Sequence, residues 1–196
     1  VIRLVVPDLE AMAREYLRVL EAISSGDASR EQDYDWLMLE LFDQTTRVSP
    51  GGEMKNFLLN LPESKRAFVR LRIGDEAEQF WLPKKIFKES QRSNIFLSKL
   101  FRRVREKLAS MLVYLIAGKA AAQSFRIGLF RSTGEIHQWM YDRYSLARLL
   151  SQAGFVNVKV CAASESGIAD YEKYSLDILQ GKSRKPDSLY VEAFKP

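Results

Sequence analysis

The most constraining feature of this sequence is its closing stretch, residues 137–196, which predicts one helix followed by two strands. Ser145 is a suitable N-cap residue, because its hydroxyl can accept a hydrogen bond from an amide of the first helical turn. Leucines then repeat at helical spacing, and Gly154 predicts the end of the helix, since glycine adopts the left-handed conformation without a side-chain clash. Apolar runs at 155–160 and 189–194 predict two strands of a buried sheet.

The beginning of the chain predicts a third strand and a helix. Residues 1–6 read Val-Ile-Arg-Leu-Val-Val, and they are followed by Pro7 and Asp8. Asp8 can cap a helix over 9–23, whose apolar residues fall on one face. A chain that begins inside a strand is typical of a segment of a longer protein, and a complete protein with trimmed numbering is the alternative.

The middle of the chain predicts mainly helices. We expect a buried helix at 34–42, two short helices at 53–60 and 62–72, a brief strand or loop at 79–82, and a strand or loop at 125–130.

The helix that ends in Ala-Gly-Phe at 153–155, with the two strands after it, resembles the closing section of a class I S-adenosylmethionine-dependent methyltransferase. Residues 1–10 resemble the fifth strand of that family. The resemblance implies an α/β fold, a partial Rossmann-like sheet made of its last three strands, closed by an antiparallel hairpin and carrying a large helical insertion. It implies one domain over 1–196, with the insertion or lid at 25–136 and the closing helix and hairpin at 137–196.

The resemblance also implies an activity. It predicts transfer of a methyl group from S-adenosylmethionine to an oxygen or nitrogen of a small-molecule or glycan acceptor, and the strings at 34–44 and 186–193 are similar to a bacterial subgroup with such acceptors. The glycine-rich turn and the acidic residue that hold the cofactor in this family are absent from the sequence. We therefore expect the chain to supply the acceptor side, with the cofactor bound only by the full-length protein.

Four residues near the two ends of the predicted sheet are candidates for the acceptor site. His137, the single histidine, is the candidate general base, and the alternative is a loop histidine that packs on Trp139. Asp8 would lie at the carboxyl edge of the sheet, where it orients or deprotonates the acceptor or only caps the following helix. Tyr141 and Arg143 would bind a polar or anionic acceptor, or else fix their loop to the body of the protein.

Three more candidates follow the predicted buried helix. Asp43, Gln44 and Arg47 are polar residues beside a predicted buried helix, where burying a polar side chain costs free energy unless it has a partner. They therefore contact a substrate, or they form caps and salt bridges inside the fold. Histidine and cysteine do not occur at metal-ligand spacing, and neither a P-loop nor a nucleophile elbow is present, which argues against metal catalysis and nucleotide hydrolysis.

A basic stretch at 84–107 supports an alternative function. It holds nine Lys and Arg against two Glu, and its apolar residues fall on one face, which predicts a basic amphipathic helix. Such a helix is either a solvated face or the binding surface of a non-catalytic module for an acidic partner or an anionic membrane. The absence of an RNA-binding signature or a helix-turn-helix pattern argues against nucleic acid.

Localisation follows from two weaker observations. The single cysteine, Cys161, is predicted to be a small core residue, which fits a reducing cytoplasm. The longest apolar run, 111–117, is shorter than the roughly 20 residues that cross a bilayer. These features predict a soluble cytoplasmic protein.

Overall fold

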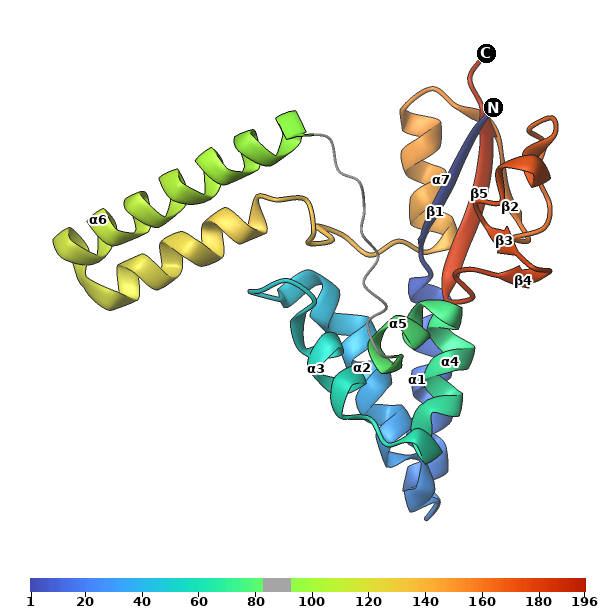
Figure 1. Cartoon of the computed structure of the whole chain (residues 1–196). Helices are drawn as coiled ribbons and strands as arrows, with labels where there is room; N and C mark the ends of the chain where they lie inside the picture. Colours follow the sequence, from blue (N-terminus) through green and yellow to red (C-terminus); the bar gives the residue numbers. More distant parts are fainter. Residues whose placement is uncertain (83–92) are drawn as a thin grey trace. The chain divides into compact units, whose positions relative to one another are not determined.

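The computed structural model describes residues 1–82 and 93–196, except for the side chains of 93–100 and of residue 102 (Figure 1). The chain forms two compact units. The first contains Val1–Thr46, Gly51–Leu82 and His137–Pro196, and the second contains Arg47–Pro50 and Pro83–Ile136. Much of the predicted insertion at 25–136 therefore belongs to the same unit as the sheet.

The sheet of the first unit has three strands, and all three are at the predicted places. They are β1 (Ile2–Pro7), β2 (Val156–Cys161) and β5 (Ser188–Phe194). β5 lies in the middle and pairs antiparallel with both neighbours (Figure 1). β1 and β2 consequently run parallel to each other. The predicted mixture of helices and strands is confirmed at this level, as a set of helices with a small antiparallel sheet.

The two faces of the sheet differ because alternate side chains of a strand point to opposite sides. Leu189, Val191 and Ala193 of β5 are buried and share a core with Leu146 and Leu150 of α7 (Arg143–Gln152). The other face carries Arg3, Tyr190 and Glu192. The connection between β2 and β5 contacts these polar side chains and contains η4 (Tyr171–Tyr174), β3 (Ile178–Leu179) and β4 (Lys182–Ser183).

The beginning of α7 corrects the prediction that Ser145 is its N-cap. Asp142 is the N-cap residue, and its Oδ1 accepts from the backbone N–H of Ser145 at 2.7 Å. Ser145 occupies the third helical position, where its hydroxyl oxygen accepts from the N–H of Asp142 at 3.0 Å. This reciprocal capping box satisfies two amides that otherwise lack partners. The end of the helix is as predicted, with Gly154 at φ 80° just after the C-cap residue.

Helices make up the rest of the first unit. Their bounds are α1 (Leu9–Ser24), η1 (Ala28–Arg30), α2 (Glu31–Thr46), α3 (Gly52–Asn60), η2 (Glu63–Lys65), α4 (Arg66–Ile73), η3 (Gly74–Ala77) and α5 (Glu78–Trp81). They share a second core around Trp36, Leu58 and Val69. The strand or loop expected at 79–82 is instead mostly the helical turn α5, in which the Trp81 indole N–H donates to the Leu58 carbonyl at 2.8 Å.

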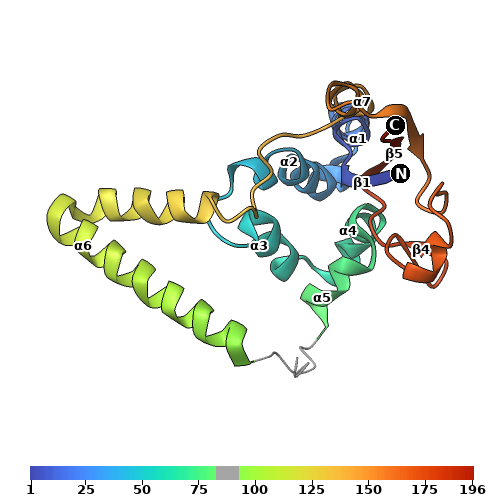
Figure 2. The same cartoon turned by 90° about the horizontal axis from the view of Figure 1, so that it is seen from above.

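The second unit contains α6 (Ser93–Arg131), which is broken at Gly118. Gly118 has φ 83° and ψ −178°, a conformation open to glycine, and the chain turns back there, so α6 forms two arms (Figures 1 and 2). The strand or loop expected at 125–130 is wrong, because these residues continue the second arm after an alanine-rich, helix-favouring start. Within the predicted basic helix, residues 93–107 are helical, and 84–92 lie outside the described residues.

Candidate functional site

The end of β1 meets two other segments of the first unit. The backbone N–H of Asp8 donates to the carbonyl of Asp187 at 3.1 Å, and the N–H of Leu9 donates to the carbonyl of Tyr141 at 3.0 Å. Asp8 is the N-cap of α1, because its Oδ1 accepts from the N–H of Ala11 at 3.1 Å. The capping interpretation of Asp8 is therefore correct, and this cap lies beside the segments that contain Tyr141 and Asp187.

Arg143 and Tyr141 both make contacts within the fold. The Arg143 Nε lies 3.0 Å from Oε2 of Glu10, which joins the first turn of α7 to the first turn of α1. The Arg143 side chain is 66% exposed, so it can also reach a molecule in solution. The Tyr141 side chain packs, partly buried, against the core between α7 and the sheet. Both residues fix their loop to the body of the protein, as one interpretation predicted.

His137, Gln44 and Asp43 meet at the end of α2. The N–H of His137 donates to the Gln44 carbonyl at 3.0 Å. The Asp43 carboxylate accepts from the N–H of Glu53 at 2.8 Å, so it caps the first turn of α3. Gly52 is required beside it, because a Cβ there would lie 2.3 Å from Asp43 Oδ2. Asp43 thus has a structural role at the junction of α2 and α3.

The short segment 137–141 connects these two groups of residues. Four Cα–Cα steps of about 3.8 Å limit the distance between its two ends to about 15 Å. Six of the seven predicted site residues therefore belong to one region of the first unit: Asp8, Asp43, Gln44, His137, Tyr141 and Arg143. The seventh, Arg47, belongs to the second unit, where its Nη1 lies 3.6 Å from Oε1 of Glu135.

The sequence interpretation missed a buried ion pair next to this region. Glu40 of α2 is fully buried and accepts a hydrogen bond from the Trp36 indole N–H. Arg72 of α4 holds the same carboxylate, with Nη2 2.8 Å from Oε2 and Nε 3.2 Å from Oε1. A glutamate inside the otherwise apolar run 36–42 was the available signal, since a charged side chain is rarely fully buried without a partner.

Asp187 was also missed, and it has the most unusual proton affinity in this region. Burial, and after it the negative charge of Glu40, raise the pKa of its carboxyl to about 6, although the positive charge of Arg72 partly opposes them. A carboxyl group with a pKa near neutrality can both accept and release a proton at physiological pH. Asp187 is therefore the strongest candidate in the region for acid–base chemistry.

A second polar cluster, around Arg3, is structural. Its guanidinium group carries five N–H donors. Nε donates to Asp177 at 2.7 Å, and Nη1 donates to Glu192 at 2.9 Å and to the Glu165 carbonyl at 2.7 Å. Nη2 donates to the carbonyls of Ala162 and Ala163, both at 3.2 Å. These five acceptors use all five N–H donors of Arg3, so none is left for a ligand. The cluster therefore holds the β2–β5 connection against the sheet.

Comparisons with known proteins do not identify the site. No protein-family model matches the sequence, and neither a curated protein nor a solved structure matches it.

Proposed function

We propose that this chain forms the acceptor side of a class I S-adenosylmethionine-dependent methyltransferase that methylates an oxygen or nitrogen of a small-molecule or glycan acceptor. The observation that carries the proposal is the position of β5, which lies between β1 and β2 and is antiparallel to both. α7 leads directly into β2, and β1 leads through Asp8 into α1. The resemblance implies an antiparallel hairpin after the closing helix, and the antiparallel pairing of β2 with β5 supports the proposal on this point.

The residues of this chain do not fit S-adenosylmethionine. In the described part of the chain, no strand leads through a glycine-rich turn into a helix, which is the arrangement that holds the cofactor in this family. The Asp8 carboxylate occupies the first turn of α1, where it accepts from the Ala11 N–H and presents a negative charge. Under the proposal, residues outside this sequence hold the methyl donor, and the contribution of this chain is confined to the acceptor.

Asp187 and His137 are the two groups that can take a proton from the acceptor. Asp187 is suited to this role because its raised pKa allows proton exchange near neutral pH. His137 was predicted for the same role from its residue type. Arg143, exposed at the start of α7, can attract a carboxylate or phosphate on the acceptor. We place this reaction in the cytoplasm, where the lone Cys161 would stay reduced.

The test is methyl transfer by the full-length protein that contains this chain. The protein is incubated with tritium-labelled S-adenosylmethionine and with fractions of glycans and small metabolites, and label in the product is counted. We expect Asp187→Asn and His137→Asn to lower turnover by about tenfold or more, with the Kd for S-adenosylmethionine unchanged. Asp170→Asn is the matched control, since Asp170 is exposed and lies on the β2–β5 connection.

Two negative results have different meanings. A full-length protein that neither binds S-adenosylmethionine nor transfers label would overturn the proposed function. A protein that transfers label equally well in all three variants would be a methyltransferase whose proton acceptor lies elsewhere.

A further inference from the structure

The first arm of α6 carries an exposed apolar stripe. Its members follow one another at intervals of three or four residues, which places them on one face of the helix. They are Phe101, Val104, Leu108, Leu112 and Leu115, and Ile116 adjoins the last of them. Their side chains are 48% to 84% exposed, although an apolar helical face is normally buried. This set of six residues is called the α6 stripe below.

The second arm of α6 does not cover the stripe. The two arms enclose a cleft of about 1000 Å³. The first arm lines this cleft with a different set of residues, namely Arg103, Glu106, Lys107, Ser110, Met111 and Tyr114. On a helix of 3.6 residues per turn, positions 103, 107, 110 and 114 lie opposite positions 101, 108, 112 and 115. The polar side of the first arm therefore faces the second arm, and the α6 stripe faces away from it.

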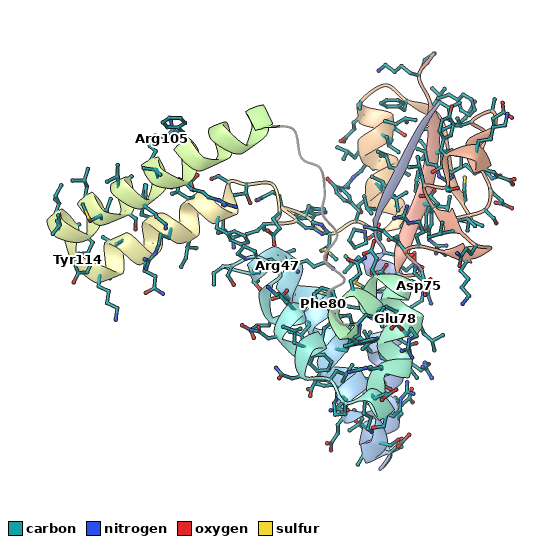
Figure 3. All side chains as sticks on the ribbon, viewed as in Figure 1. Arg47, Asp75, Glu78, Phe80, Arg105 and Tyr114 are labelled. Atoms are coloured by element: carbon teal, nitrogen blue, oxygen red, sulfur yellow. The ribbon has the colours of Figure 1, made fainter. Side chains whose placement is uncertain are left out.

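The charges around the α6 stripe are positive. Arg105 lies four residues after Phe101 and three before Leu108, so it shares the face of the stripe, and Figure 3 labels it on the first arm. Lys107 and Lys119 are also exposed, and both line the cleft on the other side of the first arm. Neither Asp nor Glu occurs between Glu106 and Glu135 in the sequence. Among the side chains that the structure describes, the second unit has seven Lys and Arg against two Glu, so it complements an anionic surface.

This charge pattern distinguishes two surfaces that could cover the α6 stripe. A second copy of the chain would bring another Arg105 to the stripe and no carboxylate from residues 107–134. Like charges that approach each other in an apolar contact oppose association. Anionic lipid headgroups would instead supply the counter-charge, while long Arg and Lys side chains reach toward the phosphates as the apolar face enters the lipid.

The geometry of α6 favours a position on the bilayer over one across it. By length and composition, Arg103–Arg131 could cross a membrane, whereas the run 111–117 alone is too short. Gly118, however, divides α6 into arms of 25 and 13 residues, 93–117 and 119–131. Charged residues recur along the first arm as far as Lys107, so its apolar part is confined to 108–117. At 1.5 Å per residue this apolar part is about 15 Å long and the second arm about 20 Å, less than the roughly 30 Å of the hydrocarbon core.

We propose that the first arm of α6 binds the surface of an anionic lipid bilayer. The α6 stripe enters the boundary between headgroups and acyl chains, with Leu115 and Ile116 near the turn at Gly118, and Ile116 is its most exposed member. Arg105, which shares the face of the α6 stripe, lies at the headgroup phosphates. This inference does not depend on the proposed methyl transfer, since it uses only residues of the second unit.

The test is flotation of the full chain with lipid vesicles. One set of vesicles is phosphatidylcholine mixed with phosphatidylglycerol, and the other is phosphatidylcholine alone. We expect binding to the mixed vesicles that weakens as salt screens the charges. Leu115→Ser with Ile116→Ser should lower the bound fraction about tenfold or more, because apolar area no longer enters the lipid. Arg105→Gln should weaken the preference for the anionic vesicles.

A matched variant tests whether vesicle binding depends on the α6 stripe itself or on exposed apolar side chains in general. Leu71→Ser with Leu176→Ser also replaces two exposed leucines, but both lie in the first unit, and we expect vesicle binding to be unchanged. All three variants alter exposed side chains, and circular dichroism checks that each retains its helices.

Three results would overturn the proposal. The first is the absence of vesicle binding by the unmodified chain. The second is a concentration-dependent dimer in sedimentation that Leu115→Ser with Ile116→Ser abolishes, with vesicle binding unaffected, which would assign the α6 stripe to a second copy. The third is binding of a DNA oligonucleotide that outcompetes the anionic vesicles and survives the loss of Leu115 and Ile116, which would assign the cations to nucleic acid.

Discussion

Arg3 and Glu192 face each other across the paired strands β1 and β5, with the Arg3 Nη1 2.9 Å from the Glu192 Oε1. Both side chains are almost completely buried. Burial alone would raise the pKa of Glu192, but hydrogen bonds from Ser166, from the Gly167 N–H and from Arg3 outweigh it and lower the pKa. The two residues therefore join the first strand of the chain to its last strand and to the connection that precedes it.

Replacing Arg3 should destabilise the protein strongly. Arg3→Met leaves the carboxylates of Glu192 and Asp177 buried without their cation, and we expect the free energy of unfolding to fall by about 3–5 kcal/mol. Urea unfolding at neutral pH measures this loss. Arg14→Met is the control, because Arg14 is 74% exposed and pairs with Glu10 on the surface, so its loss should stay within about 0.5 kcal/mol. Equal stability of the two variants would contradict the structural role of the Arg3 cluster.

Asp187 should make the protein less stable as the pH rises. Its pKa is about 6 in the folded chain and about 3.9 in an unfolded chain, so the folded state binds the proton more tightly. The protonated group therefore contributes stability below about pH 4, and that contribution is lost as the pH rises through about 6. Relative to Asp187→Asn, the unmodified chain should lose about 2 kcal/mol between these limits.

Urea unfolding of both proteins at a series of pH values tests this prediction. Asp170→Asn provides the baseline, since Asp170 is exposed and belongs to the same connection. A stability difference that stays constant with pH would mean that Asp187 has an ordinary proton affinity. If Asp187→Asn proves more stable and less active, the carboxylate is retained for function at the expense of stability.

Asp142 should stabilise α7 through its cap. Hydrogen bonds from the backbone and side chain of Ser145 lower the pKa of Asp142, so its contribution is present above the ordinary carboxyl pKa and is lost as the pH falls below it. We expect Asp142→Ala to cost about 1 kcal/mol at neutral pH and little in acid. Ser145→Ala removes the reciprocal bond and should cost less, since Asp142 can still accept from the Ser145 N–H. Thermal unfolding followed by circular dichroism compares the two variants.

The sheet and α7 could be predicted because their determinants are local. Alternating apolar residues define β1 and β5, and Gly154 alone is sufficient to predict where α7 ends. The start of α7 was misplaced by one turn, because serine is common both as an N-cap and at the third helical position of a capping box. The local pattern around Ser145 does not separate these two positions unless Asp142 is considered as the competing N-cap residue.

The acid–base properties of the candidate site could not be predicted, because they arise from residues that are distant in the sequence. The pKa of Asp187 depends on its burial and on the charges of Glu40 in α2 and Arg72 in α4. The orientation of the α6 stripe could not be predicted from the sequence for a related reason. The basic amphipathic pattern was visible, but which side faces the second arm depends on the turn at Gly118.

Gly52 should be intolerant of any side chain. Its φ is +54°, and a Cβ there would lie 2.3 Å from Oδ2 and 2.4 Å from Oδ1 of Asp43, whose carboxylate caps α3. Gly52→Ala therefore adds backbone strain and displaces the cap, and we expect it to lower the free energy of unfolding by more than about 2 kcal/mol. Gly134→Ala is the matched control, because Gly134 has φ +83° but open space around it, so its cost should be about 1 kcal/mol from the backbone alone. Urea unfolding measures both, and a Gly52→Ala variant no less stable than Gly134→Ala would show that Asp43 does not approach α3 as closely as described.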